Sequence, residues 1–241
     1  ASKVIEVSDV NELVNLTLDD SFIGSVIKTS AFNLLNQVGW EDKKFEPLGG
    51  AEYRVMSKAA ADSEGVSYWI SGDLEANYAF LVDSDYVLLL NDSQEVELEQ
   101  LGALGDGVQD TYEILDLAIN NLRYDGSGFY IGGRKIKLRD SATYYVSRYI
   151  NIKTVTHIEG SGTGLPSNLS TPRILFANGS TGFIVHRYNT IDNTVEESST
   201  TAADSSSFVG FTILGGRGES DAIGGHAIWM RARAIVEKVG I

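Results

Sequence analysis

The chain has 241 residues, no cysteine and a formal net charge of −14 at pH 7. The absence of cysteine excludes disulfides, thiolate metal sites and cysteine nucleophiles, and the acidic balance argues against nucleic-acid binding, which needs clustered Lys and Arg. No apolar run reaches about 18 residues, so we expect no insertion into a membrane. The three histidines are dispersed along the chain, and we predict neither a metal site nor a cofactor.

The first hundred residues differ from the rest in charge. They contain 6 Lys and Arg residues against 19 Asp and Glu residues, a net charge of −13, and residues 101–241 carry the remaining −1. Their pattern predicts, in chain order, a capped helix at 8–14, a turn leading into a strand at 49–55, a loop at 60–66, and strands at 68–70 and 86–90. We therefore predict a small mixed α/β head over residues 1–91, followed by a neck linker at 92–100 that is partly a strand.

Residues 101–119 combine a glycine-rich turn with a short helix. Gly102, Gly105 and Gly107 lie within six residues and allow a tight turn with positive φ angles. Asp110 stands where a helix N-cap belongs, and Glu113 three residues later completes a capping-box pattern. Apolar side chains then recur on one helical face: Ile114, Leu115, Ala118, Ile119 and Leu122. We predict that this amphipathic helix closes the open end of a coil of strands.

This segment resembles the opening motif of the pectate-lyase-like right-handed β-helix proteins. That family includes phage tailspikes and bacterial polysaccharide lyases, hydrolases and epimerases. The residues that carry the resemblance are Gly102, Ala103, Gly105, Asp106, Gly107, Asp110, Leu115, Ala118 and Ile119. The resemblance implies the fold and says little about the reaction, because fold and chemistry are separate claims.

Short apolar runs recur from residue 129 to residue 241. Runs that begin at Phe183, Phe208 and Ile228 are 25 and 20 residues apart, a spacing that suits a solenoid turn of three short strands. The segment 159–164, with its Gly-x-Gly pattern, is expected to close one such turn. A polar insert between Thr190 and Ser206 is expected to be a loop, either lining a binding groove or lying free on the surface.

Together these patterns predict a mainly β protein. We expect a mixed α/β head at 1–91, a linker at 92–100, and a helix-capped right-handed parallel β-helix at 101–241. Residues 235–241 keep a strand pattern with no polar cap to cover the last turn, so we expect the β-helix to continue in a longer polypeptide.

One group of polar residues combines acids, a histidine and guanidinium groups that can grip an acidic sugar. We take Glu219, Asp221 and His226 as candidate catalytic residues, and Arg217, Arg231 and Arg233 as candidate substrate-binding residues. The alternative is a charged loop with solvated arginines.

The family resemblance implies the N-terminal portion of a phage tailspike. Such a protein is a homotrimer located in the virion, which binds a phage tail or adaptor protein, here through residues 1–100, and acts outside the cell on a host surface polysaccharide. If the whole protein is an enzyme, we expect a polysaccharide depolymerase, a glycoside hydrolase or a lyase, whose main active site lies outside these 241 residues. Two alternatives stay open: a secreted bacterial polysaccharide lyase or epimerase, and a non-enzymatic structural tail fibre.

Overall fold

The computed structural model describes residues 4–32, 47–72, 77–91, 95–120, 123–124, 130–131, 135–152, 155–162, 170–177, 180, 182–185, 206–215, 227–230 and 234–240. The chain forms two compact units. The first, called the N-terminal unit, comprises Ala1–Ser93, Glu99–Leu104 and Arg123–Phe129. The second, called the coil unit, comprises Gln94–Leu98, Gly105–Leu122 and Tyr130–Ile241.

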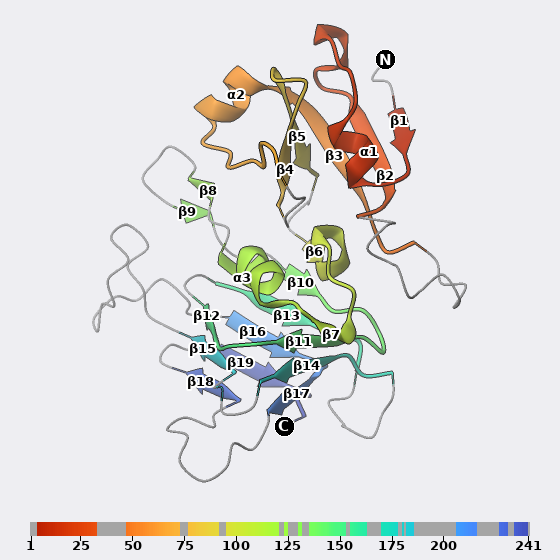
Figure 1. Cartoon of the computed structure of the whole chain (residues 1–241). Coiled ribbons are helices and arrows are strands. Elements are labelled where there is room, and N and C mark those ends of the chain that lie inside the picture. Colours follow the sequence, from red (N-terminus) through yellow and green to blue (C-terminus); the bar gives the residue numbers. More distant parts are fainter. Residues whose placement is uncertain are drawn as a thin grey trace. The chain divides into compact units, whose positions relative to one another are not determined.

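The N-terminal unit is built on one five-stranded sheet (Figure 1). In sheet order its strands are β1 (Val4–Val7), β2 (Val26–Ala31), β3 (Gly49–Ser57), β5 (Tyr86–Leu90) and β4 (Ala79–Val82). The β1–β2 pair is parallel and the other pairs are antiparallel. The described part of this unit also contains helices α1 (Val10–Val14) and α2 (Lys58–Ser63) and the short 3-10 helix η1 (Asp20–Phe22). The strands predicted at 49–55 and 86–90 are confirmed.

Helix α1 begins where the sequence places a cap. The Asp9 side chain accepts a hydrogen bond from the Glu12 backbone N–H at 2.9 Å. The Glu12 carboxylate in turn accepts from the backbone N–H and the hydroxyl of Ser8, both at 2.7 Å. These two bonds from Ser8 lower the pKa of Glu12. The predicted helix is therefore confirmed, with reciprocal capping of its first turn.

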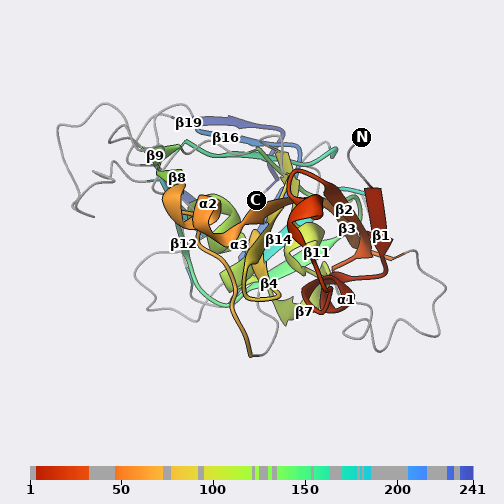
Figure 2. The same ribbon diagram turned by 90° about the horizontal axis from the view of Figure 1, so that it is seen from above.

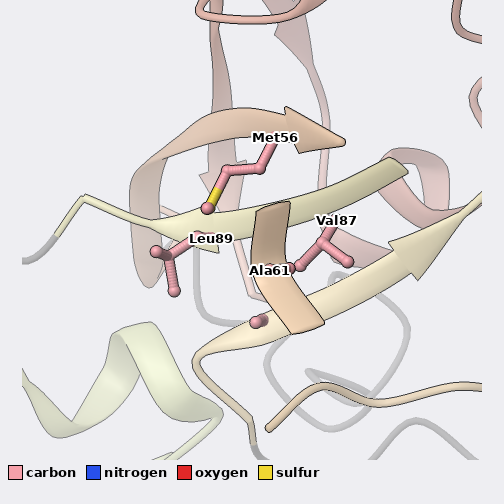
Figure 3. Packing of buried hydrophobic residues seen from close by; sticks show 5 residues of the cluster. Met56, Ala61, Val87 and Leu89 are labelled. Carbon is pink, nitrogen blue, oxygen red and sulfur yellow. The ribbon is translucent and has the colours of Figure 1, made fainter. Parts of the chain in front are cut away.

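Helix α2 corrects the loop that the sequence predicts at 60–66. The Ser57 hydroxyl accepts from the Ala60 N–H at 3.2 Å and caps the helix, and Lys58 pairs with Asp62 at 2.5 Å one turn later. Ala61 is buried and packs in one cluster with Met56 of β3 and with Val87 and Leu89 of β5 (Figure 3). Six residues are too few to reveal a helical period in the sequence, so burial against the sheet decides this element.

Residues 68–70 do not form the predicted strand. Trp69 alone makes a parallel bridge to Phe80 of β4. Its N–H donates to the Ala79 carbonyl at 2.9 Å, and its own carbonyl accepts from the Leu81 N–H at 2.8 Å. The pairing is confined to this bridge, and the next residue, Ile70, is 65% exposed.

The coil unit consists of three parallel sheets that the chain visits in turn. The first sheet contains β6 (Glu95–Glu97), β10 (Lys135–Lys137), β13 (His157–Glu159), β16 (Ser206–Val209) and β19 (Ala234–Glu237). The second contains β7 (Asp106–Asp110), β11 (Thr143–Val146), β14 (Arg173–Phe176) and β17 (Thr212–Gly215). The third contains β12 (Ile150–Ile152), β15 (Phe183–Val185) and β18 (Ile228–Met230).

From β10 onward each complete turn of the coil lays one strand on each sheet, which is the architecture of a parallel β-helix. Figure 2 shows β16 and β19 side by side, as their parallel register requires. The short strands β8 (Arg123–Tyr124) and β9 (Tyr130–Ile131) precede β10. Residues 95–97 of the predicted linker form β6 of the first sheet, and Leu98–Leu101 form the 3-10 helix η4.

Helix α3 (Tyr112–Asn120) follows β7 in the first turn of the coil. It contacts β12, the first strand of the third sheet, and the Asn120 side-chain amide donates to the Asn151 carbonyl at 2.8 Å. Its predicted apolar face is confirmed, since four residues are buried: Ile114, Leu115, Ala118 and Ile119. Leu122, the fifth predicted position, lies outside the described residues. The helix thus packs at the end of the third sheet, in the position next to β12.

The interior of the coil is a column of stacked apolar side chains. Val96, Ile136, Ile158 and Phe208 lie in register on successive strands of the first sheet, and each is fully buried. Phe183, from the third sheet, fills the space beside this column, with its ring centroid 5.4 Å from that of Phe208. One residue per strand thus builds a continuous core, although no single turn can bury its own inner face.

The structure corrects the predicted repeat of 25 and 20 residues. Phe183 pairs with Ile228 on the third sheet, whereas Phe208 pairs with Ile158 on the first. The three runs therefore do not mark equivalent positions of successive turns. The chain between β15 and β16 contains most of the predicted polar insert, and residues 186–205 lie outside the described residues. Because the connections between strands differ in length, the spacing of the apolar runs alone does not reveal the number of residues in one turn of the coil.

Candidate functional site

The predicted catalytic and sugar-binding residues lie outside the described residues. This applies to Glu219, Asp221 and His226 and equally to Arg217, Arg231 and Arg233. Their roles remain predictions from the sequence. Within the described part of the chain, two other features can position functional groups: the glycine motif at 102–110 and a charged outer face on the first sheet.

The glycine motif adopts the backbone that the sequence predicts. Gly102, Gly105 and Gly107 have φ angles of 97°, 64° and 77°. A β-carbon on Gly102 would lie 2.9 Å from the Phe32 ring, so both its conformation and its close packing require glycine. Ala103 next to it is buried.

The two acids of the motif hold the start of the coil by hydrogen bonds. One Asp106 carboxylate oxygen accepts from the N–H groups of Val108 and Gln109, both at 2.9 Å. One Asp110 oxygen accepts from Tyr112 N–H at 3.0 Å and from Ser147 N–H at 3.1 Å. Asp110 therefore ties the beginning of α3 to the residue that follows β11 on the next turn. Its role is structural.

The predicted N-cap at Asp110 is displaced by one residue. Strand β7 runs through Asp110, and the Thr111 carbonyl accepts the first helical bond, from Leu115 N–H at 2.9 Å. Pairing of β7 with β11 keeps Asp110 extended, so Thr111 occupies the cap position. Glu113 does not close a capping box from Asp110, because it instead pairs with Arg148 at 2.8 Å.

The surroundings of Asp110 favour its charged form. Partial burial opposes ionisation, but hydrogen bonds from the Ser147 hydroxyl and from the backbone N–H groups of Tyr112 and Ser147 outweigh it, with help from Arg148. The net result is a pKa below the ordinary value for aspartate. A negative charge is therefore retained at the junction of β7 and α3.

The outer face of the first sheet carries stacked charges of alternating sign. Lys135 lies between Glu95, at 3.3 Å, and Glu159, at 2.6 Å. Lys137 lies 3.4 Å from Glu97 and 3.9 Å from Glu95. Hydrogen bonds to Glu159 and Glu95 raise the pKa of Lys135. These side chains are roughly half exposed, so each pair adds little to stability, about 0–1 kcal/mol.

A cavity of about 340 Å³ opens on this charged face. Its polar side chains include both donors and acceptors: Glu97, Lys135, Lys137, Arg139, Asp140, Glu159 and Ser161. Ser161 donates a hydrogen bond to Asp140. Such a mixed lining can exchange hydrogen bonds with the hydroxyl groups of a saccharide, and its cations can contact an acidic sugar.

Sequence reasoning missed this charged face. The alternation at 95–97, 135–137 and 157–159 is visible in the sequence, but these segments are 40 and 22 residues apart. Only the parallel register places them on adjacent strands. Among the described residues no group of three His, Asp or Glu side chains could hold a metal ion. No helix in the described ranges is long and apolar enough to span a membrane.

Comparison with solved structures identifies the fold. The tailspike protein of Acinetobacter phage vB_ApiP_P1 is similar to this chain with a TM-score of 0.51 at 15% identity, over 89% of this chain and 30% of that protein. Full-length tailspike protein 2 of an Escherichia coli O157:H7 bacteriophage has a TM-score of 0.46 at 19% identity, covering 86% of this chain and 28% of that one. The enzymatically active domain of tailspike protein 2 from bacteriophage CBA120 has a TM-score of 0.46 at 18% identity, covering 86% of this chain and 32% of that one.

The chain therefore has a tailspike-like fold, as its similarity to the Acinetobacter phage tailspike shows. The chain spans about 30% of the length of that tailspike. No protein-family model and no curated protein matches the sequence.

Proposed function

We propose that this chain is the N-terminal portion of a phage tailspike. The observation that supports this most directly is the combination of a small sheet unit and a helix-capped parallel β-helix, with a fold similar to that of a phage tailspike over 89% of the chain. In this proposal the protein is a homotrimer located in the virion. The N-terminal unit attaches it to a tail or adaptor protein.

The coil unit, in the same proposal, supports contact with a host surface polysaccharide. Its outer face on the first sheet presents carboxylates, ammonium groups and a hydroxyl around one cavity. Hydrolysis of a glycosidic bond needs two carboxyl groups at a set separation, about 5–9.5 Å depending on the stereochemistry. Both Glu97 and Glu159 are held by lysines, so we assign this cavity to binding rather than to catalysis.

The depolymerase itself is proposed to lie elsewhere in the whole protein. Within these 241 residues, Glu219, Asp221 and His226 remain the candidates. The described residues carry no catalytic assignment.

The test uses the full-length protein and purified surface polysaccharide from a host strain. We expect the polysaccharide to lose viscosity and to release oligosaccharides, and light scattering to give three times the mass of one chain. Antibodies against residues 1–91 should label intact virions at the tail. A monomer that cleaves uronates with calcium would instead support a secreted lyase or epimerase. A trimer that binds without forming product would support a structural fibre.

A further inference from the structure

The N-terminal unit contains a cavity of about 660 Å³ beside helix α1 and strand β4. This volume falls within the range of about 300–1,000 Å³ that is usual for ligand sites. Its lining comes from α1 and its C-cap, from β4, from the turn after β4 and from the segment around Trp69: Asn11, Val14, Asn15, Trp69, Ile70, Gly72, Leu81, Asp83 and Ser84. The cavity therefore gathers segments that are far apart in the sequence.

One wall of this cavity is apolar and held in place. The backbone of Trp69 is fixed to β4 by two hydrogen bonds, from its N–H to Ala79 and from Leu81 to its carbonyl. Ile70 follows directly and is 65% exposed, although it is a large apolar residue. A fixed aromatic residue next to an exposed aliphatic one is suited to contact with an apolar side chain of another molecule.

Asn11, one of the lining residues, has an unused hydrogen-bond donor. The side-chain nitrogen of Asn11 is buried and has no hydrogen-bond partner among the described residues. The backbone carbonyl of the same residue is already engaged by the Asn15 amide at 2.7 Å. Because a buried donor without a partner is unfavourable, a carbonyl group beside Asn11 would relieve this cost once the side chain turns toward the cavity.

The described lining of the cavity carries a negative charge and no positive one. Asp83 lines it, and one of its carboxylate oxygens accepts from Leu18 N–H at 3.3 Å. The described residues that line the cavity include no Lys or Arg. Residues 1–100 together have a net charge of −13.

We propose that this cavity binds a segment of a partner protein in which an Arg or Lys stands beside an apolar residue. The cation pairs with Asp83, a backbone carbonyl of the segment accepts from Asn11, and the apolar side chain packs on Trp69 and Ile70. This inference rests on the proposed attachment of the N-terminal unit to the phage tail, and it identifies the kind of surface that the tail must present.

The experiment measures attachment of the full-length protein to phage particles that lack it, by co-sedimentation. Asp83→Asn removes the charge but keeps an acceptor for Leu18, and Asn tolerates the positive φ of 51° at this position. Ile70→Glu changes an exposed side chain. We expect each variant to weaken attachment by about tenfold or more. The matched control is Glu6→Gln on β1, the opposite edge of the same sheet, which should stay within about twofold.

A second measurement separates this inference from the proposed function. An acetylated and amidated Leu-Arg-Leu peptide is titrated against the chain while the Trp69 indole N–H resonance is followed by NMR. We expect a saturable shift that Asp83→Asn abolishes and that a Leu-Glu-Leu peptide does not produce. If the wild-type protein attaches to particles, and neither variant weakens attachment, this inference is wrong and the tailspike proposal stands. If the wild-type protein never attaches, the tailspike proposal fails, and the titration alone tests the proposed binding to the cavity. The absence of a shift in the Trp69 resonance would then overturn this inference.

Discussion

The two units of this chain reach a buried core by different routes. In the N-terminal unit, a sheet with one parallel and three antiparallel pairs is packed by short helices, as where Ala61 of α2 meets Met56 and Val87. In the coil unit every pair of the three sheets is parallel, and like positions stack in columns, as Ile136, Ile158 and Phe208 do. A core substitution in the N-terminal unit should therefore destabilise one helix–sheet layer. A core substitution in the coil unit should destabilise the turns on both sides of it.

At the corners of the coil, the backbones of successive turns come into direct contact, as the backbone at Gly49 of β3 does with Glu99 in the N-terminal unit. Gly160 and Gly210 follow β13 and β16 and stack directly, so that a β-carbon on Gly210 would lie 2.1 Å from the Gly160 carbonyl oxygen. Gly160 N–H donates to Val209 and Gly162 N–H to Gly210, both at 2.8 Å. The backbones of successive turns thus touch at the corner, and side chains are excluded there. This agrees with the prediction that a Gly-x-Gly segment closes one turn.

The largest expected effect comes from Phe208→Ala in the core column. Phe208 is fully buried and packs on Phe183, so its removal should lower the free energy of unfolding of the coil by about 3–5 kcal/mol. Hydrogen exchange should accelerate in β13 and β16. The matched variant Leu88→Ala, in the N-terminal sheet, should instead accelerate exchange in β3 and β5. If either variant accelerates hydrogen exchange equally in both units, the two units unfold together, and their cores are not independent.

Gly210→Ala should have the next largest effect. The φ angle of 72° costs a side chain about 1–2 kcal/mol, and the contact with the Gly160 carbonyl adds about 1–3 kcal/mol, so we expect a loss of about 2–5 kcal/mol. Chemical denaturation followed by circular dichroism measures it. Gly215→Ala is the control, because nothing lies within 4 Å of a β-carbon there. Equal losses for the two variants would show that the stacked corner is unimportant.

Asp9→Ala tests the capping of α1 in the N-terminal unit. Loss of the acceptor for Glu12 N–H should destabilise this unit by about 1 kcal/mol, visible as a lower denaturation midpoint. Asp9→Asn keeps an acceptor and should recover most of the loss. A full effect in both variants would mean that the charge of Asp9, rather than its cap, stabilises the unit.

The smallest effect is the pH dependence of Asp110. Its folded pKa lies below the ordinary value of 3.8, so the ionised carboxylate stabilises the coil above that pH, and the contribution disappears as the pH falls through the lowered pKa. The side chain is largely exposed, and we expect less than about 1 kcal/mol. Unfolding of wild type and Asp110→Asn at several pH values should give curves that converge in acid. A difference that grows in acid would contradict this assignment.

Local patterns predicted the elements that local chemistry controls. The capped helix α1, the apolar face of α3 and the positive φ angles of the glycine motif all follow from neighbouring residues. The six-residue helix α2 was missed because its signal is burial against β3 and β5 rather than a period. The N-cap of α3 was misplaced because pairing with β11 keeps Asp110 extended.

The candidate sites divide in the same way. The charges of Glu95, Lys135 and Glu159 are visible in the sequence, but their contact depends on which strands are adjacent. The cavity at Asn11 and Asp83 joins segments about 70 residues apart and has no sequence motif.

The sequence by itself therefore determined the acidic N-terminal part, the glycine motif with its helix, and the mainly β character of the chain beyond that helix, because these depend on composition and on short-range spacing. Only the tertiary structure decided which strands stack, where glycine alone fits a corner, and which charges meet. Those outcomes depend on the register between strands that are 22 or more residues apart in the coil. Because the connections between strands differ in length, no constant spacing in the sequence reveals that register.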